Sequence, residues 1–209
     1  MYLPIAMEMK DKDRIFQFIN DNSFGVLITP SLEASDLPFL LMRGQSQLGK
    51  LYFHMAKANP HQHLIEGEKA LAVFQGPHSY ISPTWYESIN AVPTWNYISI
   101  HCYGTVEKLS DSELESAMYD LVRHHESDLL QEPSPMPEQF WKKKLSAISG
   151  FSLNIERIQG KEKLGQHRSV GDQKKVFSML SKSSDPESLK LARYMKQNKI
   201  GTGEGGVNE

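Results

Sequence analysis

The chain has 209 residues, of which 39% are hydrophobic and 23% charged, and its formal net charge is −2. A chain of this length can bury a full core, and it contains no apolar run of about 18 residues that would span a membrane. Because Cys102 is its one cysteine, an internal disulfide and a cysteine-based zinc site are excluded, and no secretory signal is visible before Glu8. We therefore expect a cytoplasmic protein.

Hydrophobic spacing predicts helices and short strands in an irregular order along the chain. Helices are expected at 11–20, 60–66, 110–125, around Phe140, Trp141 and Leu145, at 172–181 and at 185–198. Strands are expected at 23–29, 39–42, 51–55, 70–74, 97–109 and 151–155. The prolines Pro133, Pro135 and Pro137 interrupt the chain between helices, and the glycine-rich end at 201–209 is expected to be disordered.

Two helix starts are marked by their capping residues. Ser110 and Glu113 form a capping box, in which each side chain satisfies a backbone N–H of the first helical turn. Asn59 and Pro60 are favourable residues for an N-cap and a first helical position, and Gly67 suits the end of that short helix. Helices inserted among about six antiparallel strands indicate an α+β fold built on a small closed or split barrel.

The segment from Phe74 to Tyr103 is rich in aromatic residues, prolines and hydroxyl groups. A core strand does not need Pro77, Pro83 and Pro93, because proline removes hydrogen-bond donors from the sheet. An irregular loop does not need so many aromatic rings unless they pack on something. Three explanations stay open at this point: the rings pack on the core, on a second subunit or on a flat cofactor.

A strand leads into a helix N-terminus at Phe53–His61, with Lys57 just before the cap. Such an N-terminus is either an ordinary capped helix or a phosphate site, in which backbone amides and the lysine charge bind the anion. No glycine-rich phosphate motif of the Rossmann or P-loop type occurs. His61 and His63 are two residues apart on the expected helix and cannot bind one metal ion together, so we assign no metal site. No nucleophile elbow is present, and we assign no catalytic residues.

The net charge hides an uneven distribution. Residues 1–156 hold 12 Lys and Arg against 19 Asp and Glu, whereas residues 157–199 hold 11 against four. A basic C-terminal third either contacts a polyanion such as nucleic acid or keeps the outer faces of two helices solvated.

Several segments together resemble the PaiB family of FMN-binding split-barrel proteins, which are negative transcriptional regulators of sporulation and protease synthesis. The resemblance extends from residue 1 to about residue 180. It is carried by Met1–Pro4, Leu37–Phe39, Ala56–His61, Gly76–Pro83, Trp85–Tyr86, Val92–Tyr97, Tyr103–Gly104, Ile148–Phe151 and Lys163–Leu164. The chain departs from the family at Asp36, where a histidine is usual, and at Gly165–Ser169, where Gln166 and Arg168 match the family pattern.

This resemblance implies a six-stranded antiparallel split barrel with peripheral helices, a helical C-terminal extension, and a homodimer with FMN at its interface. It implies that the flavin ring edge meets backbone at Leu37, Pro38 and Phe39, and that His54, Lys57 and Asn59 hold the phosphate. Trp85 or Trp95 of a partner subunit would cover the ring face. It also implies three parts: an FMN-binding barrel at 1–160, a basic helical extension at 161–200 and a tail at 201–209.

The function implied by the resemblance is that of a dimeric FMN-binding transcriptional regulator. DNA contacts are expected in the basic third, at Lys163, Arg168, Lys174 and Lys175. The alternatives are an FMN-dependent oxidoreductase of the pyridoxamine-phosphate-oxidase or flavin-reductase type and a ligand-sensing barrel that has lost its flavin. Asp36, an acidic residue near the expected flavin site, is the feature that favours the last alternative.

Overall fold

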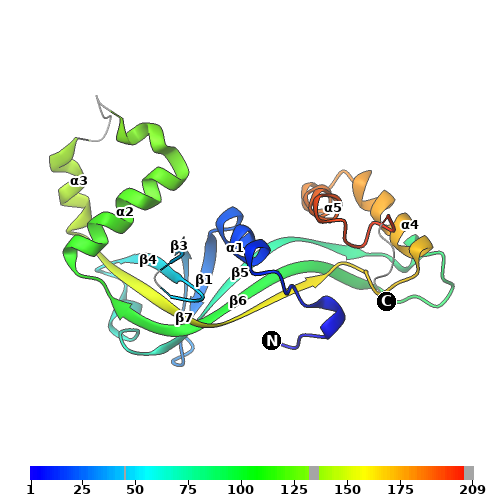
Figure 1. The fold of residues 1–209 in the computed structure, drawn as a ribbon, viewed down its shortest axis with the longest axis horizontal. Coiled ribbons are helices and arrows are strands. Elements are labelled where there is room, and N and C mark those ends of the chain that lie inside the picture. The colour runs from blue at the N-terminus through cyan, green and yellow to red at the C-terminus, as the bar shows by residue number, and fades with distance from the viewer. Residues whose placement is uncertain (45, 132–136, 205–209) are drawn as a thin grey trace. The chain divides into compact units, whose positions relative to one another are not determined.

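A computed structural model describes residues 1–44, 46–131 and 137–204 of the chain. The expectations for Pro133, Pro135 and the tail at 205–209 lie outside these described residues. The α+β fold is confirmed: one antiparallel sheet of seven strands has the order β2-β1-β5-β6-β7-β4-β3 and is accompanied by helices (Figure 1). The strands are β1 (Phe24–Ile28), β2 (Ala34–Pro38), β3 (Leu40–Met42), β4 (Lys50–Ala56), β5 (Lys69–Ile81), β6 (Thr94–Lys108) and β7 (Ile148–Lys163).

The helices agree closely with the sequence expectations, and the capping box of Ser110 and Glu113 is present. The α-helices are α1 (Lys12–Asp21), α2 (Asp111–Glu126), α3 (Glu138–Leu145), α4 (Val170–Ser181) and α5 (Pro186–Asn198). The short 3-10 helices are η1 (Ile5–Met7), η2 (Pro60–His63), η3 (Pro83–Trp85) and η4 (Ser127–Leu130).

A single residue, Phe39, connects the two ends of the sheet. The chain leaves β2, the first strand of the sheet order, passes Phe39, and enters β3, the last strand of that order. β2 pairs with β1, and β3 pairs with β4, both in antiparallel register. Since one residue cannot bridge a flat seven-stranded sheet, the sheet must curl until its ends meet. This closure makes the split barrel that was expected, with seven strands in place of six.

The chain divides into two compact units, each assembled from separate stretches. Unit 1 consists of Met1–Ile15, Gln75–Ile100 and the described residues from Gln159 onward, and unit 2 consists of Phe16–Phe74 and His101–Ile158.

Four phenylalanines, one from the link between β2 and β3 and three from the strands β4, β5 and β7, form the centre of unit 2. The ring of Phe39 lies 5.4 Å from that of Phe53 and 5.3 Å from that of Phe74, and Phe53 stacks on Phe151 at 5.7 Å. All four side chains are less than 2% exposed. Burial of rings this large stabilises the barrel, and each favourable ring pair contributes about 0.5–1.5 kcal/mol more.

A second apolar cluster in unit 2 joins α2 and α3 to the sheet. Leu114, Ala117 and Met118 on α2 are buried, and the half-buried rings of Tyr52 and Trp141 pack against them. α3 supplies Trp141 and β4 supplies Tyr52, so one outer face of β4 is covered by this helical pair.

In unit 1, α4 and α5 lie side by side (Figure 1). Their buried positions include Val176 and Leu180 on α4 and Leu191 and Met195 on α5. The hydroxyls of Ser79 on β5 and Ser188 on α5 lie 2.8 Å apart and fasten the helix to the strand.

A buried carboxylate in unit 1 ties three elements together. The Glu162 side chain on β7 is 4% exposed and accepts hydrogen bonds from the guanidinium of Arg14 on α1 and, at 2.6 Å, from the hydroxyl of Tyr194 on α5. Burial and the negative charge of Glu162 raise the pKa of Tyr194 above its ordinary value, so the phenol stays protonated and donates.

Two strands extend well beyond their expected bounds. β5 continues from the expected 70–74 through Pro77 to Ile81, and β7 continues from the expected 151–155 to Lys163, past residue 160. The pairing of β1 with β5 runs only from Ile28↔Leu71 to Val26↔Val73, so Pro77 lies beyond the residues that β1 pairs. Proline is tolerated at such an edge position because no neighbour there requires its missing N–H.

Three smaller expectations are corrected. The helix expected at 60–66 is a single 3-10 turn, Pro60–His63, and Gly67 has the expected left-handed backbone with φ of 79°. The strand β2 was missed because Ala34–Pro38 lacks an apolar run and carries Asp36. Gly201 and Thr202 are buried, although disorder was expected from residue 201 onward.

Candidate functional site

The end of β4 and the following turn bring His54, Lys57 and Asn59 into one short stretch of unit 2. The Asn59 side chain caps η2 by accepting the N–H of His61 at 3.0 Å. The backbone N–H of Lys57 donates to the carbonyl of Ala147 at 2.9 Å, which fixes the turn to the start of β7. Lys57 itself is exposed, and the described residues place no carboxylate within ion-pair distance of its ammonium group.

His54 holds an unsatisfied polar atom at this site. The residue is half-buried and pairs with Gly150 on β7, and its Nδ1 is buried without a hydrogen-bond partner among the described residues. Burial lowers the pKa of His54 below its ordinary value, so the ring is neutral at pH 7. A buried ring nitrogen without a partner is unfavourable, and a ligand polar group at Nδ1 would remove this penalty.

In the stretch Leu37–Phe39 the outer two side chains are buried, whereas Pro38 is half-buried. The side chains of Leu37 and Phe39 are 6% and 1% exposed, and Phe39 is part of the aromatic centre. The Phe39 N–H already donates to the carbonyl of Ser23 at 2.8 Å. The half-buried Pro38 and the remaining backbone groups of this stretch are therefore the ones that can meet a flavin edge.

His61 fixes the position of η2 on the barrel. Its Nε2 lies 3.0 Å from the hydroxyl of Thr29, and its Nδ1 lies 2.8 Å from the hydroxyl of Ser35. The residue is 3% exposed, and this burial lowers its pKa, while the charge of Glu33 acts in the opposite direction. His61 therefore has both ring nitrogens occupied and serves the structure.

The two tryptophans expected to cover a flavin both lie in unit 1. Trp85 ends η3 and is half-buried. Trp95 is the second residue of β6, is 52% exposed and lies beside the rings of His78, at 5.9 Å, and Tyr80, at 6.1 Å. The ammonium of Lys163 donates to the carbonyl of Trp95 at 3.0 Å. Trp95 is thus an exposed ring whose backbone is held in place.

The loop after η3 is held by a buried carboxylate on α4. The side chain of Asp172, which is 2% exposed, accepts the N–H groups of Glu87 at 2.8 Å and Ser88 at 3.0 Å, and the Ser88 hydroxyl at 2.7 Å. Burial alone would raise the pKa of Asp172, but these hydrogen bonds outweigh it and lower the pKa below its ordinary value. The carboxylate is therefore ionised and positions the loop.

Three cations in unit 1 lie against aromatic rings or neutral oxygens. Lys161 is 8% exposed, donates to the carbonyl of Tyr2 at 3.0 Å and lies 5.4 Å from the centre of the Tyr97 ring. Lys163 is half-buried, and Arg168 lies 4.9 Å from the centre of the Tyr86 ring. No carboxylate of the described residues lies within ion-pair distance of these three. Sequence reasoning missed Lys161, because nothing in its local pattern signals a buried lysine.

Lys174 and Lys175, by contrast, are exposed on α4. The ammonium of Lys175 lies 3.7 Å from a carboxylate oxygen of Glu87, a contact that is largely solvated. The outer surfaces of α4 and α5 and their ends add five more exposed cations: Lys182, Lys190, Arg193, Lys196 and Lys199. The basic C-terminal third is thus mostly a solvated helical surface, while Lys163 donates to the oxygens of Thr94 and Trp95 and Arg168 lies over the Tyr86 ring.

Residues 1–44, 46–131 and 137–204 hold neither a cluster of metal ligands nor a helix that could span a membrane. This part of the chain brings no three His, Cys, Asp or Glu side chains together as metal ligands. It also has no helix with the length and hydrophobicity needed to cross a bilayer. Burial raises the pKa of the Cys102 thiol, so this cysteine is an unreactive core residue.

Comparison with known proteins identifies the family. The family model described as "Putative FMN-binding domain" matches residues 1–157. The Bacillus subtilis "Protease synthase and sporulation protein PAI 2" is 30% identical over 204 residues, covering 94% of this chain and 97% of its own length.

Two solved structures share the fold at low sequence identity. The flavocytochrome Anf3 from Azotobacter vinelandii superposes with a TM-score of 0.56 at 14% identity, covering 75% of this chain and 69% of its own. The FAD and heme binding protein from Mycobacterium smegmatis gives a TM-score of 0.56 at 15% identity, covering 75% and 73%. The family match, the full-length relative and the split barrel agree with one another. The chain belongs to the PaiB-type FMN-binding family, and FMN is its cofactor.

Proposed function

We propose that this chain is a dimeric, cytoplasmic FMN-binding protein that regulates transcription. The observation that carries the proposal is the similarity to PAI 2, because it covers almost the whole of both chains and therefore includes the basic C-terminal part beyond the FMN-binding match. The name of that relative refers to protease synthesis and sporulation, which are processes controlled at the level of gene expression.

The FMN site in this proposal is the β4 turn together with the main chain of Leu37–Phe39. His54 supports it because its buried Nδ1 needs a partner, and Lys57 supports it because its ammonium is exposed beside a fixed turn. Asn59 uses its side-chain oxygen for the cap, so it positions the turn and offers only its amide NH2 to a phosphate. When bound, FMN supplies a redox-active ring, while these residues bind and orient it.

Replacing Lys57 with alanine tests this assignment. A charged hydrogen bond to phosphate contributes about 1.5–3 kcal/mol, so FMN affinity is expected to fall by about tenfold to 150-fold. Titrating apo-protein with FMN and following the quenching of flavin fluorescence measures this affinity. Lys143→Ala, which removes an exposed lysine from α3, is the matched control. Equal affinities of the two variants would show that Lys57 does not bind the phosphate.

The dimer in this proposal places Trp95, or Trp85, of one subunit against the flavin of the other. Support comes from the exposed rings of Tyr80, at 45%, and Trp95, at 52%, since tyrosine and tryptophan are enriched where proteins associate. Trp95→Ala is expected to weaken the dimer and to restore flavin fluorescence. Light scattering after size-exclusion chromatography gives the mass. A monomeric wild-type protein would contradict the dimer, and an unchanged flavin signal would contradict the placement of Trp95.

DNA binding is proposed for the basic extension at 161–200, with Lys174 and Lys175 as phosphate contacts. Their exposed side chains on α4 support this proposal, and Lys163 at the end of β7 and Arg168 in the loop that follows then act with them. Replacing both Lys174 and Lys175 with glutamine is expected to weaken binding to promoter DNA and to reduce the slope of log K against log salt by about two. Fluorescence anisotropy measures both quantities, and Lys142→Gln/Lys143→Gln on α3 is the control. If neither the wild type nor the control variant binds DNA at low salt, the assignment as a regulator is wrong. The assignment of the FMN site is tested separately, by the FMN titration.

A further inference from the structure

A cleft of about 410 Å³ opens on unit 2. It is lined by the end of β1, the start of β5, the middle of β6 and a stretch of β7. Its volume is within the range of about 300–1,000 Å³ that small-molecule sites occupy. None of Leu37–Phe39, His54, Lys57, Asn59, Trp85 or Trp95 contributes to its lining.

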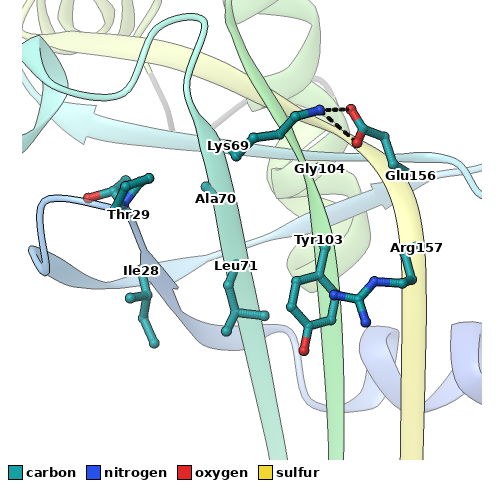
Figure 2. A pocket seen from close by; sticks show the side chains of 10 residues that line it. Ile28, Thr29, Lys69, Ala70, Leu71, Tyr103, Gly104, Glu156 and Arg157 are labelled. Carbon is teal, nitrogen blue, oxygen red and sulfur yellow. Dashed lines mark hydrogen bonds and ion pairs between the residues drawn. The ribbon is translucent and has the colours of Figure 1, made fainter. Parts of the chain in front are cut away.

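One wall of the cleft is apolar. Ile28 and Leu71 are direct partners in the register of β1 and β5, so their side chains lie next to each other on the same face. Figure 2 shows these two side chains and the ring of Tyr103 in a row across three strands. All three are half-buried without a ligand, which leaves apolar surface for a ligand to cover.

Of the two cations that line the cleft, Lys69 is paired with a carboxylate among the described residues and Arg157 is not. The ammonium of Lys69 donates to both carboxylate oxygens of Glu156, at 2.6 and 2.7 Å (Figure 2). The Thr105 hydroxyl donates to the same carboxylate at 2.7 Å. Glu156 is therefore the one carboxylate in the lining, and its charge is balanced by Lys69.

Arg157 is the cation that remains. Its guanidinium carbon lies 3.6 Å from the centre of the Tyr103 ring, so the guanidinium is held at the apolar wall. Within the described residues no carboxylate lies within ion-pair distance of Arg157. A guanidinium fixed against a ring keeps its planar fork of N–H donors at the edge, where it matches the two oxygens of a carboxylate.

We propose that this cleft binds a small organic carboxylate with an apolar, ring-like body. The carboxylate would pair with Arg157, and the body would lie on Tyr103, Leu71 and Ile28. A monoanion fits better than a phosphate dianion, because the lining offers one unbalanced positive charge and Glu156 would repel a second negative charge. None of the residues assigned to FMN lines this cleft, and the proposal does not depend on the proposed function.

Benzoate is a suitable probe, because it joins a carboxylate directly to a flat apolar ring. Isothermal titration of the FMN-loaded protein with benzoate is expected to give saturable binding. Arg157→Gln is expected to weaken it about tenfold or more, since it removes a charge-assisted pair. Arg123→Gln, which removes an exposed arginine from α2, is the control and is expected to bind benzoate as the wild type does. Benzamide, which is uncharged and of the same shape, is expected to bind much more weakly than benzoate.

The proposal would be overturned if benzoate showed no saturable binding, if Arg157→Gln bound benzoate as tightly as the wild type does, or if benzamide bound as tightly as benzoate. Light scattering gives the mass of Arg157→Gln. If this mass differs from that of the wild type and the wild type does not bind benzoate, the cleft is an interface with a second copy of the chain, and the proposal is overturned. Urea unfolding of each variant establishes that it is folded. The flavin absorbance of the same samples reports the flavin site independently, so a failure of the FMN assignment is visible separately from a failure of this one.

Discussion

Replacing Glu162 perturbs the point at which α1, β7 and α5 are joined in unit 1. The carboxylate is 4% exposed and accepts bonds from Arg14 and Tyr194, while the Arg14 side chain is 33% exposed. Removing one partner of a buried ion pair costs about 3–5 kcal/mol, chiefly because the other charge is left unpaired. Since Arg14 keeps part of its hydration, we expect the lower end, about 3 kcal/mol, for Glu162→Leu. Tyr194→Phe removes one hydrogen bond to a charged acceptor and is expected to cost about 1.5 kcal/mol.

Urea unfolding followed by circular dichroism measures these changes, provided that the midpoint shifts while the slope m stays constant. The double variant Arg14→Met/Glu162→Leu replaces the pair with apolar groups and should be more stable than the sum of its single variants predicts, because no charge is left alone. Glu187→Ala, which breaks an exposed pair with Lys190 on α5, is the control and should change stability by less than about 1 kcal/mol. A Glu162→Leu protein as stable as this control, or strictly additive single variants, would refute the reasoning.

Three more predictions concern stability. Asp172→Ala is expected to cost about 2–3 kcal/mol, because the N–H groups that this carboxylate accepts are left unpaired; urea midpoints measure it, and an unchanged midpoint would contradict it. The folded state lowers the pKa of Asp172, so the stabilisation of the fold by this carboxylate is present above its unfolded pKa of about 3.9 and is lost as the pH falls further. The wild type should therefore lose more stability than Asp172→Ala between pH 5 and pH 3. Burial also lowers the pKa of His61, so the free energy of unfolding should decrease as the pH falls below about 6.5, and should do so less in His61→Gln. Gly104→Ala places a Cβ against the carbonyl of Asn154 on β7; we expect a lower melting temperature by differential scanning calorimetry, and an unchanged one would contradict the close approach of the two strands.

Local signals were sufficient to predict most helices. The capping box of Ser110 and Glu113, and the pair Asp185 and Pro186, place helix starts within a residue of their observed positions, because caps act over three or four residues. The long strands were underestimated for the opposite reason. Whether Pro77 belongs to a strand depends on where β1 stops pairing, and that register is set by residues about 50 positions away along the chain.

The family resemblance was enough to select His54, Lys57 and Asn59 as candidate flavin residues. They are also close in sequence, so a single turn brings them together. The arrangement of the cleft could not be predicted from the sequence. Ile28, Tyr103 and Arg157 meet only because β1, β6 and β7 are brought together by the sheet, and each residue taken alone is typical of an ordinary strand. The same holds for the pair of Arg14 and Glu162, whose partners are 148 residues apart.

The link through Phe39 has a consequence for aggregation. A sheet that ends in two free strands offers unpaired N–H and C=O groups, onto which another chain can add. In unit 2 the two strands that would be such ends, β2 and β3, are consecutive, short, and drawn toward each other by a residue whose ring is 1% exposed. Phe39, anchored in the aromatic centre, thus fixes the place of both end strands. A variant that removes the packing of the Phe39 ring would release the unpaired edges of β2 and β3 together. We expect its first defect to be insolubility during expression.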